Sequence, residues 1–325
     1  MFHFVSTVLV WRIVNGFRCI FTGHGSAGSL SAIFCRTCRF TARSEGGVCK
    51  YLIRGGRVCL TQQSSGRLPA GFAHLQPPLT YHVSRQKYSV LTMPLHIGIV
   101  GCSAEGAALC YRTICAEGAR VLGPHAHPEI SIHTPSLADY VTCLDKGDLV
   151  GVGELMLASA KKLASAGADF LICPDNTIHE AFSFVESRSP LPWLHIAEEV
   201  ALVASERGYR RLGITGTSWL VDSAVYPDKL AAKGIQYLRP SDKDRDEMSR
   251  IIMEELVYGV VTSKATAYFQ SVIQGFKKQS CDAVVLGCTE IPLLVSDANS
   301  PLPTLDSTRL LAQAALRRAT GTAAQ

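Results

Sequence analysis

Two segments of this chain recur, in the same order, a little over a hundred residues further on. Ile97-Gly98-Ile99 returns as Leu212-Gly213-Ile214, 115 residues later. The pair Ala168-Asp169, followed by three apolar residues, returns as Cys281-Asp282, 113 residues later. Because the two spacings are nearly equal, the repeat predicts two halves built on one plan.

Short apolar runs alternate with longer amphipathic stretches from Leu95 onward, which is typical of βα units and a parallel sheet. The expected strands are Leu95–Gly101, Glu129–His133, Asp169–Cys173, Trp193–His195, Arg211–Thr215 and Asp282–Gly287. The expected helices include Gly151–Ala166, Ile196–Arg207 and Met248–Tyr258. The predicted fold class is α/β, with two pseudo-symmetric parallel-sheet domains. We expect the halves to be residues 93–209, with 303–320 packing back on them, and residues 210–302.

Residues 1–92 differ from the rest in charge and pattern. They carry 11 Lys and Arg against the single acid Glu45, whereas the remainder carries 21 basic and 26 acidic residues. The segment shows no sustained period of 3.6 or 2 residues. It is expected to be an unstructured or non-native N-terminal extension, either an Arg-rich organellar transit segment or translated sequence upstream of a start at Met93.

Charge and cysteine usage exclude several classes of protein. The acidic body lacks the clustered cations of a nucleic-acid groove, and no run of 18 uncharged apolar residues predicts a membrane helix. Cys35 and Cys38 have the CxxC spacing of a zinc knuckle, but the sequence around them lacks a second pair of zinc ligands. The later cysteines stand singly in apolar runs, and Cys102 is among those expected to be core or helix-face residues. Reduced thiols favour a cytoplasmic location.

Polar loops follow the second repeated strand in both halves. These loops read Cys173-Pro-Asp175-Asn176-Thr177 and Gly287-Cys288-Thr289-Glu290. Asp175 lies six residues after Asp169, and Cys288 lies six residues after Asp282, so the two are equivalent in the repeat. Ligands of such sheets bind beyond the carboxyl ends of the strands. We therefore expect Asp175 and Cys288 to approach one ligand from opposite sides, as proton transfer on two faces of a carbon requires.

Three motifs together resemble the cofactor-independent aspartate/glutamate racemase superfamily. They are Gly-Cys-Thr-Glu-Ile-Pro at 287–292, Asn-Thr-x-His at 176–179 and the opening Ile-Gly-Ile-Val-Gly. The resemblance covers residues 95 to about 319. It implies an active site between two α/β domains, no pyridoxal phosphate and no metal. It also implies a racemase or isomerase of the EC 5.1.1 type that acts at the carbon α to a carboxylate, with catalysis by Cys288.

The chain departs from this family at one catalytic position. Racemases of the family carry a cysteine immediately before Asn-Thr, and Asp175 stands there instead. The resemblance assigns substrate binding to Ser103, Asn176, Thr177, Thr217, Thr289 and Glu290. Ser103 and Thr217 are equally well explained as helix N-caps. His179 and His195 are candidate substrate-binding residues at the same edge of the cleft. The alternative is that they are packed core histidines.

Two other functions stay open beside a racemase. A malonate-type decarboxylase would use the single thiol, and a two-lobed carboxylate-binding protein would lack turnover. The sequence contains no GxGxxG, GxxxxGK[ST] or GxSxG motif, so dinucleotide, nucleotide and serine-hydrolase functions are not expected. The expected partner is a small carboxylate, without nucleic acid or membrane, and a homodimer is compatible with this.

Overall fold

The computed structural model describes residues 93–322 throughout and, before them, the backbone of five strands between residues 9 and 61. The chain divides into two units, 1–86 and 87–325. In the first unit β1 (Leu9–Arg12) pairs with β2 (Arg18–Phe21), and β4 (Gly47–Arg54) pairs with β3 (Thr41–Ser44) and β5 (Arg57–Thr61), all antiparallel. The sequence analysis predicted none of these strands. Cys35 and Cys38 lie outside the described residues, and the assignment of residues 1–92 to a non-native extension stays a prediction.

The second unit contains two parallel sheets of the same topology. The first has the order β7-β6-β8-β9, and the second has the order β11-β10-β12-β13. The strands are β6 (Ile97–Val100), β7 (Ile130–His133), β8 (Phe170–Ile172), β9 (Trp193–Leu194), β10 (Arg211–Thr215), β11 (Gln236–Leu238), β12 (Ala283–Leu286) and β13 (Thr304–Asp306). The α/β class and the parallel sheet in each half therefore follow the prediction, whereas β11 and β13 were not predicted.

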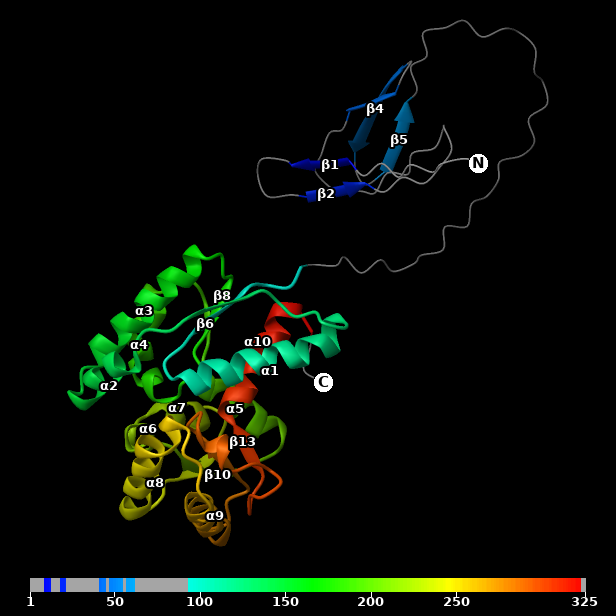
Figure 1. Cartoon of the computed structure of the whole chain (residues 1–325). Helices are drawn as coiled ribbons and strands as arrows, with labels where there is room; N and C mark the ends of the chain where they lie inside the picture. Colours follow the sequence, from blue (N-terminus) through cyan, green and yellow to red (C-terminus); the bar gives the residue numbers. More distant parts are fainter. Residues whose placement is uncertain are drawn as a thin grey trace, which may run out of the picture. The chain divides into compact units, whose positions relative to one another are not determined.

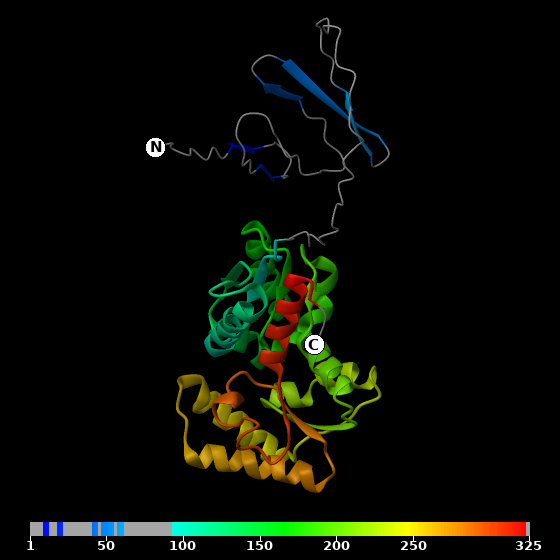
Figure 2. The same ribbon diagram turned by 90° about the vertical axis from the view of Figure 1, so that its right-hand side faces the viewer.

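Helices cover both faces of each sheet, as Figures 1 and 2 show. The α-helices are α1 (Ala104–Leu122), α2 (Leu137–Asp145), α3 (Leu149–Ser165), α4 (Phe182–Val185), α5 (Ile196–Glu206), α6 (Ser218–Asp222), α7 (Val225–Ala231), α8 (Asp242–Glu254), α9 (Ser263–Lys278) and α10 (Ser307–Thr320). Short 3₁₀ helices are η1 (Thr177–Ala181), η2 (Glu186–Arg188), η3 (Leu256–Tyr258) and η4 (Ile291–Leu293). In the part of the chain that the structure describes, no helix is long and apolar enough to cross a membrane.

Each central strand sends alternate side chains into two cores, one on each face of its sheet. Ile97 and Ile99 pack in a core that includes residues of α1 and α10, whereas Val100 packs in the core that includes residues of α2 and α3. In the second sheet, Leu212 and Ile214 of β10 pack toward α5 and α7. Such burial on both faces explains why the strands appear as continuous apolar runs. Helix α10 lies against α1 and α5, although β13 just before it belongs to the second sheet.

The repeated residues have the same structural task in both halves. Asp169 accepts the backbone N–H of His96 at 2.7 Å, and Asp282 accepts those of Arg210 and Arg211 at 2.6 and 2.9 Å. Each carboxylate thus holds the start of the neighbouring central strand. A Cβ atom on Gly98 would lie 2.6 Å from Leu171 Cδ2, and one on Gly213 would collide with the ring of Phe276 in α9. The repeated glycines therefore let neighbouring side chains pack closely against each central strand.

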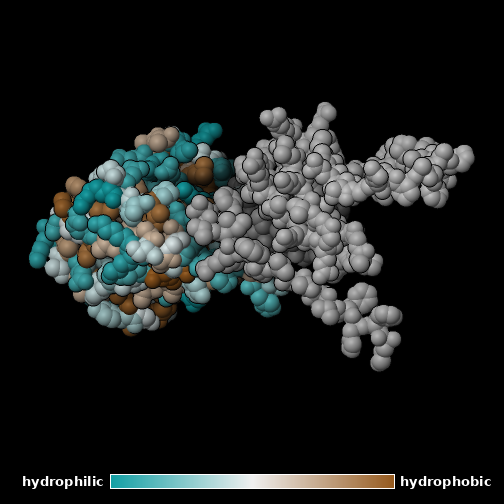
Figure 3. Space-filling model, turned by 90° about the horizontal axis from the view of Figure 1, so that it is seen from above, coloured by the Kyte–Doolittle hydropathy of each residue, from teal (hydrophilic) through white to brown (hydrophobic). Residues whose placement is uncertain are grey.

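The surface of this unit is mainly polar on the face that Figure 3 shows, with hydrophobic residues scattered among hydrophilic ones. Scattered apolar residues are ordinary for a folded protein and do not by themselves mark an interface.

Substitution of the repeated glycine tests this packing. Gly213→Ala places a methyl group against Phe276 and is expected to lower the free energy of unfolding by ~1–3 kcal/mol, as overpacking does. Gly275→Ala, in the same helix as Phe276, meets open space and is expected to raise it by ~0.5–1 kcal/mol, because alanine favours helix. Urea unfolding followed by circular dichroism measures both. Equal effects of the two substitutions would contradict the role given to Gly213.

Candidate active site

A cavity of about 50 Å³ lies where loops from the two halves meet. Asp175 follows β8 and Cys288 follows β12, at the carboxyl ends of equivalent strands. The polar residues that line the cavity are Cys102, Ser103, Asp175, Thr177, Thr217, Cys288 and Glu290. The structure therefore brings together both residues predicted to be catalytic and four of the eight predicted to bind substrate.

A larger open depression of about 640 Å³ lies elsewhere, beside Arg210, Lys233 and Gln236. It borders the amino ends of β10 and β11, and none of the predicted site residues lines it. Because parallel sheets bind ligands at the opposite ends of their strands, the smaller cavity is the better candidate for the active site.

Asp175 is partly buried, and its carboxylate is held by the turn that follows it. Its Oδ1 atom accepts the backbone N–H of Ile178 at 3.3 Å. Burial raises the pKa of Asp175 to about 6, and the negative charge of Glu290 adds to this, while hydrogen bonds from Ile178, Cys102 and Thr177 oppose it. The carboxyl group therefore changes its protonation close to neutral pH, as a group that both accepts and donates a proton must.

Cys288 is paired with a carboxylate from its own loop. Its thiol donates to Glu290 Oε2 at 3.0 Å, and the Thr289 hydroxyl donates to the same oxygen at 2.7 Å. Burial raises the pKa of the Cys288 thiol well above its ordinary value, and the charges of Glu290 and Asp175 raise it further. Cys288 is thus kept protonated, with Glu290 positioned to receive its proton.

Ser103 and Thr217 combine the two roles considered for them. The Ser103 hydroxyl accepts the N–H of Gly106 at 3.1 Å and so caps α1, and Thr217 caps α6 through the N–H of Leu220 at 3.4 Å. The same hydroxyls lie beside others in the site, Ser103 at 3.1 Å from Thr289 and Thr217 at 3.2 Å from Thr177. Since Thr289 donates to Glu290, Ser103 must donate to Thr289.

Asn176 lies outside the cavity lining, although the sequence analysis placed it among the substrate-binding residues. It is 2% exposed, and protein groups occupy both ends of its amide. Tyr226 donates to its Oδ1 atom at 2.6 Å, and its Nδ2 atom donates to Ser307 at 3.0 Å. Asn176 therefore anchors the loop that carries Asp175. Thr289 also lies outside the lining and supports Glu290 and Ser103.

His179 and His195 form a buried pair behind the Asp175 loop and do not line the cavity. Their ring centroids are 4.6 Å apart. His179 Nδ1 donates to the carbonyl of Asp175 at 2.6 Å, and its Nε2 atom accepts the N–H of Ile196 at 3.4 Å. Burial lowers the pKa of His179 to about 4 and that of His195 to about 2. Neutral His179 thus positions the backbone at Asp175.

Sequence reasoning missed part of the site. Cys102 is a core residue, as expected, but it also lines the cavity beside Asp175. Its place two residues after β6 and directly before Ser103 was the available signal. The remaining wall is apolar and comes from α2, α6, α8, η1 and η3. Among the described residues, no group of three or more His, Cys, Asp or Glu side chains is arranged to hold a metal ion.

The raised pKa of Asp175 predicts a pH-dependent effect of Asp175→Asn on stability. The unfolded carboxyl group ionises near its ordinary pKa of 3.8 and the folded one near 6, so wild-type stability falls as the pH rises between these values. Asparagine does not ionise and avoids this loss. In urea unfolding at both pH values, the variant should gain about 3 kcal/mol over the wild type at pH 7.5 and only ~0.5 kcal/mol at pH 4. A difference independent of pH would contradict the burial of this charge.

The comparisons with known proteins agree with this geometry. The family model for Asp/Glu/Hydantoin racemase matches residues 98–315. A candidate Asp/Glu racemase structure from Yersinia pestis is 30% identical, with a TM-score of 0.64 over 69% of this chain and 99% of that one. An aspartate racemase homologue from Pyrococcus horikoshii OT3 is 25% identical, with a TM-score of 0.60 over 69% and 98%.

Two curated relatives match a shorter region. The broad specificity amino-acid racemase RacX of Bacillus subtilis is 24% identical over 49% of this chain and 68% of its own. The glutamate racemase of Limosilactobacillus reuteri is 24% identical over 46% of this chain and 55%, about half, of its own. These matches confirm the predicted fold class and the expectation of an amino-acid racemase whose substrate is not fixed. They do not favour a decarboxylase or a binding protein. This chain belongs to the Asp/Glu/Hydantoin racemase family.

Proposed function

We propose that this protein interconverts the two enantiomers of an amino acid without a cofactor: one of Asp175 and Cys288 removes the α-proton, and the other donates a proton to the opposite face. One observation carries the proposal: the two side chains come from equivalent strand ends in the two halves and line one cavity. Two groups related in this way can reach opposite faces of one carbon atom, as inversion by two bases requires.

The proton balance of the reaction follows from the two side chains. In one direction the Asp175 carboxylate takes the α-proton, the electron pair moves into the substrate carboxylate, and the Cys288 thiol donates its proton to the opposite face. In the other direction the same steps run in reverse: the Cys288 thiolate removes the α-proton, and protonated Asp175 donates its proton to the opposite face. Between turnovers Glu290, 3.0 Å from the sulfur, is positioned to exchange a proton with Cys288. The pKa of about 6 at Asp175 makes both of its forms available near neutral pH.

The substrate carboxylate is assigned to the hydroxyl groups of Thr177 and Thr217 and to the N-terminus of α1, where Ser103 lines the cavity. Both threonines line the cavity as well, and the dipole of the long helix α1 favours an anion at its N-terminus. With Asp175 and Glu290 facing the same cavity, a substrate with two carboxylates on one carbon would be repelled. This repulsion is a physical reason to prefer racemisation to decarboxylation of a malonate.

A reducing compartment is part of this proposal. The described cysteines, at positions 102, 110, 115, 143, 173, 281 and 288, are all free thiols. Unpaired cysteines are usual in proteins of reducing compartments, and the mechanism requires Cys288 to stay reduced. Both facts support the expected cytoplasmic location.

Replacement of Cys288 tests the thiol. Cys288→Ser is expected to slow exchange of the substrate α-proton with solvent by ~10²–10⁴-fold from the enantiomer that Cys288 deprotonates, because a hydroxyl is a far weaker acid than a thiol. Cys173→Ser is the matched control, since Cys173 follows the equivalent strand β8 but does not line the cavity. Exchange is measured in D₂O by proton NMR, with circular dichroism to check the fold. An equal loss in both variants would contradict the assignment.

Asp175→Asn tests the second group. Because it removes one base and keeps the other, it should stop exchange from one enantiomer and leave measurable exchange from its mirror image. The same NMR assay is run on each pure enantiomer, with Asp148→Asn, at the distant N-cap of α3, as control. Unchanged exchange from both enantiomers in Asp175→Asn would leave Cys288 as the sole proton-transfer group.

A further inference from the structure

One wall of the cavity is built from apolar side chains that no part of the proton-transfer mechanism uses. Leu137, Val141 and Leu144 lie on one face of α2, with spacings of four and three residues. Trp219 of α6 and Ile252 and Met253 of α8 complete this wall, which we call the apolar wall. It faces the same space as Asp175 and Cys288, so a substrate held between these two side chains would touch it.

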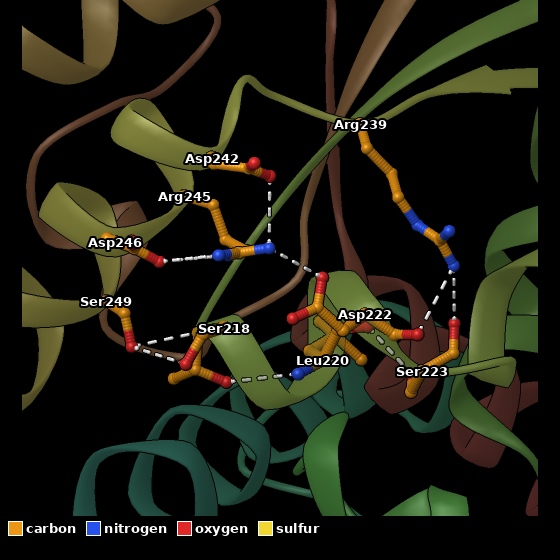
Figure 4. Close-up of polar contacts among 10 residues, drawn as sticks. Ser218, Leu220, Asp222, Ser223, Arg239, Asp242, Arg245, Asp246 and Ser249 are labelled. Carbon is orange, nitrogen blue, oxygen red and sulfur yellow. Dashed lines mark hydrogen bonds and ion pairs between the residues drawn. The ribbon is translucent and has the colours of Figure 1, made fainter.

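The arginines on and beside α8 are engaged elsewhere. None of the residues that line the cavity is Lys or Arg. Arg245, on the same helix as Met253, pairs with Asp222, Asp242 and Asp246, as Figure 4 shows.

Two further arginines, Arg250 on α8 and Arg239 just before it, are also bonded to protein groups. Arg250 pairs with Glu247, Glu254 and Glu255. Arg239 donates to the carbonyls of Asp222 and Ser223 at the end of α6. Ser218 and Ser249, whose hydroxyl oxygens lie 3.2 Å apart, hold α6 against α8.

A negatively charged substrate side chain would therefore be buried without a partner. It would lose its hydration, find no cation, and face the carboxylates of Asp175 and Glu290. A hydrocarbon side chain of the same shape would meet apolar surface and gain from leaving water. Both effects act in the same direction.

We propose that the apolar wall is the side-chain subsite and that the substrates are α-amino acids with a hydrocarbon side chain, rather than aspartate or glutamate. This inference rests on the proposed function, because it assumes that the α-carbon lies between Asp175 and Cys288. Leucine is the natural probe, since its side chain has nearly the shape of the aspartate side chain and lacks only the charge.

The first experiment compares leucine and aspartate as substrates of the full chain. Exchange of the α-proton in D₂O is followed by NMR for both enantiomers of each. Leucine is expected to exchange at least ~10-fold faster than aspartate in kcat/KM, the scale of discrimination that pocket complementarity supplies. Faster exchange of aspartate would overturn the inference and leave the proposed racemase function standing.

A binding experiment separates the inference from the chemistry. Calorimetric titration compares 4-methylpentanoate with succinate, which are leucine and aspartate without their amino groups. Tighter binding of 4-methylpentanoate by at least ~10-fold supports the apolar subsite even where neither amino acid exchanges, which would count against the racemase proposal alone. Tighter binding of succinate, or binding of neither, would overturn the subsite.

A charge placed in the wall provides the matched test. Met253→Lys keeps an unbranched stem and adds a cation to the lining, so it should shift the leucine to aspartate ratio at least ~10-fold toward aspartate. Tyr258→Lys is the control, because Tyr258 lies nearby in η3 but is 76% exposed and outside the lining. Thermal unfolding checks that both variants fold. The same shift in both would show a general effect of charge and contradict the subsite.

Discussion

A chain of three buried hydrogen bonds joins the two proton-transfer loops, and the site depends on it. Tyr226 donates to Asn176, Asn176 donates to Ser307, and Ser307 donates to the carbonyl of Leu286 at 2.8 Å. Asn176 directly follows Asp175, and Leu286 lies two residues before Cys288. Buried polar groups are costly to leave unpaired, so these bonds fix the distance between the halves at the catalytic position.

The repeat explains why one fold can position two unlike groups so similarly. In both halves a central strand pairs in parallel with the strand that precedes the catalytic loop, β6 with β8 and β10 with β12. Asp175 and Cys288 therefore lie beyond the carboxyl ends of equivalent strands. Their surroundings differ: the Asp175 carboxylate accepts the backbone N–H of Ile178, whereas the Cys288 thiol donates to Glu290. The carboxylate thus stands at the catalytic position of the first half and the thiol at that of the second.

Much of this architecture was predictable, because buried parallel strands leave continuous apolar runs and the repeat indicates two halves built on one plan. Strands β11 and β13 escaped prediction since they have three residues each and lie at or near a sheet edge. The role of Asn176 could not be foreseen because its partners are 50 and 131 residues away. The apolar wall combines faces of three helices, and in sequence each face is indistinguishable from one that packs in a core.

The central claim, that two groups act on opposite faces of the α-carbon, is tested most directly by the isotope content of the first product. A single enantiomer is converted to a few per cent in D₂O, and product and recovered substrate are analysed separately by mass spectrometry. With the proton taken by one of Asp175 and Cys288 and a deuteron supplied by the other, the product should be almost fully deuterated while the recovered substrate keeps its proton. Product that retains the original proton would mean that one group serves both faces, and would contradict this account.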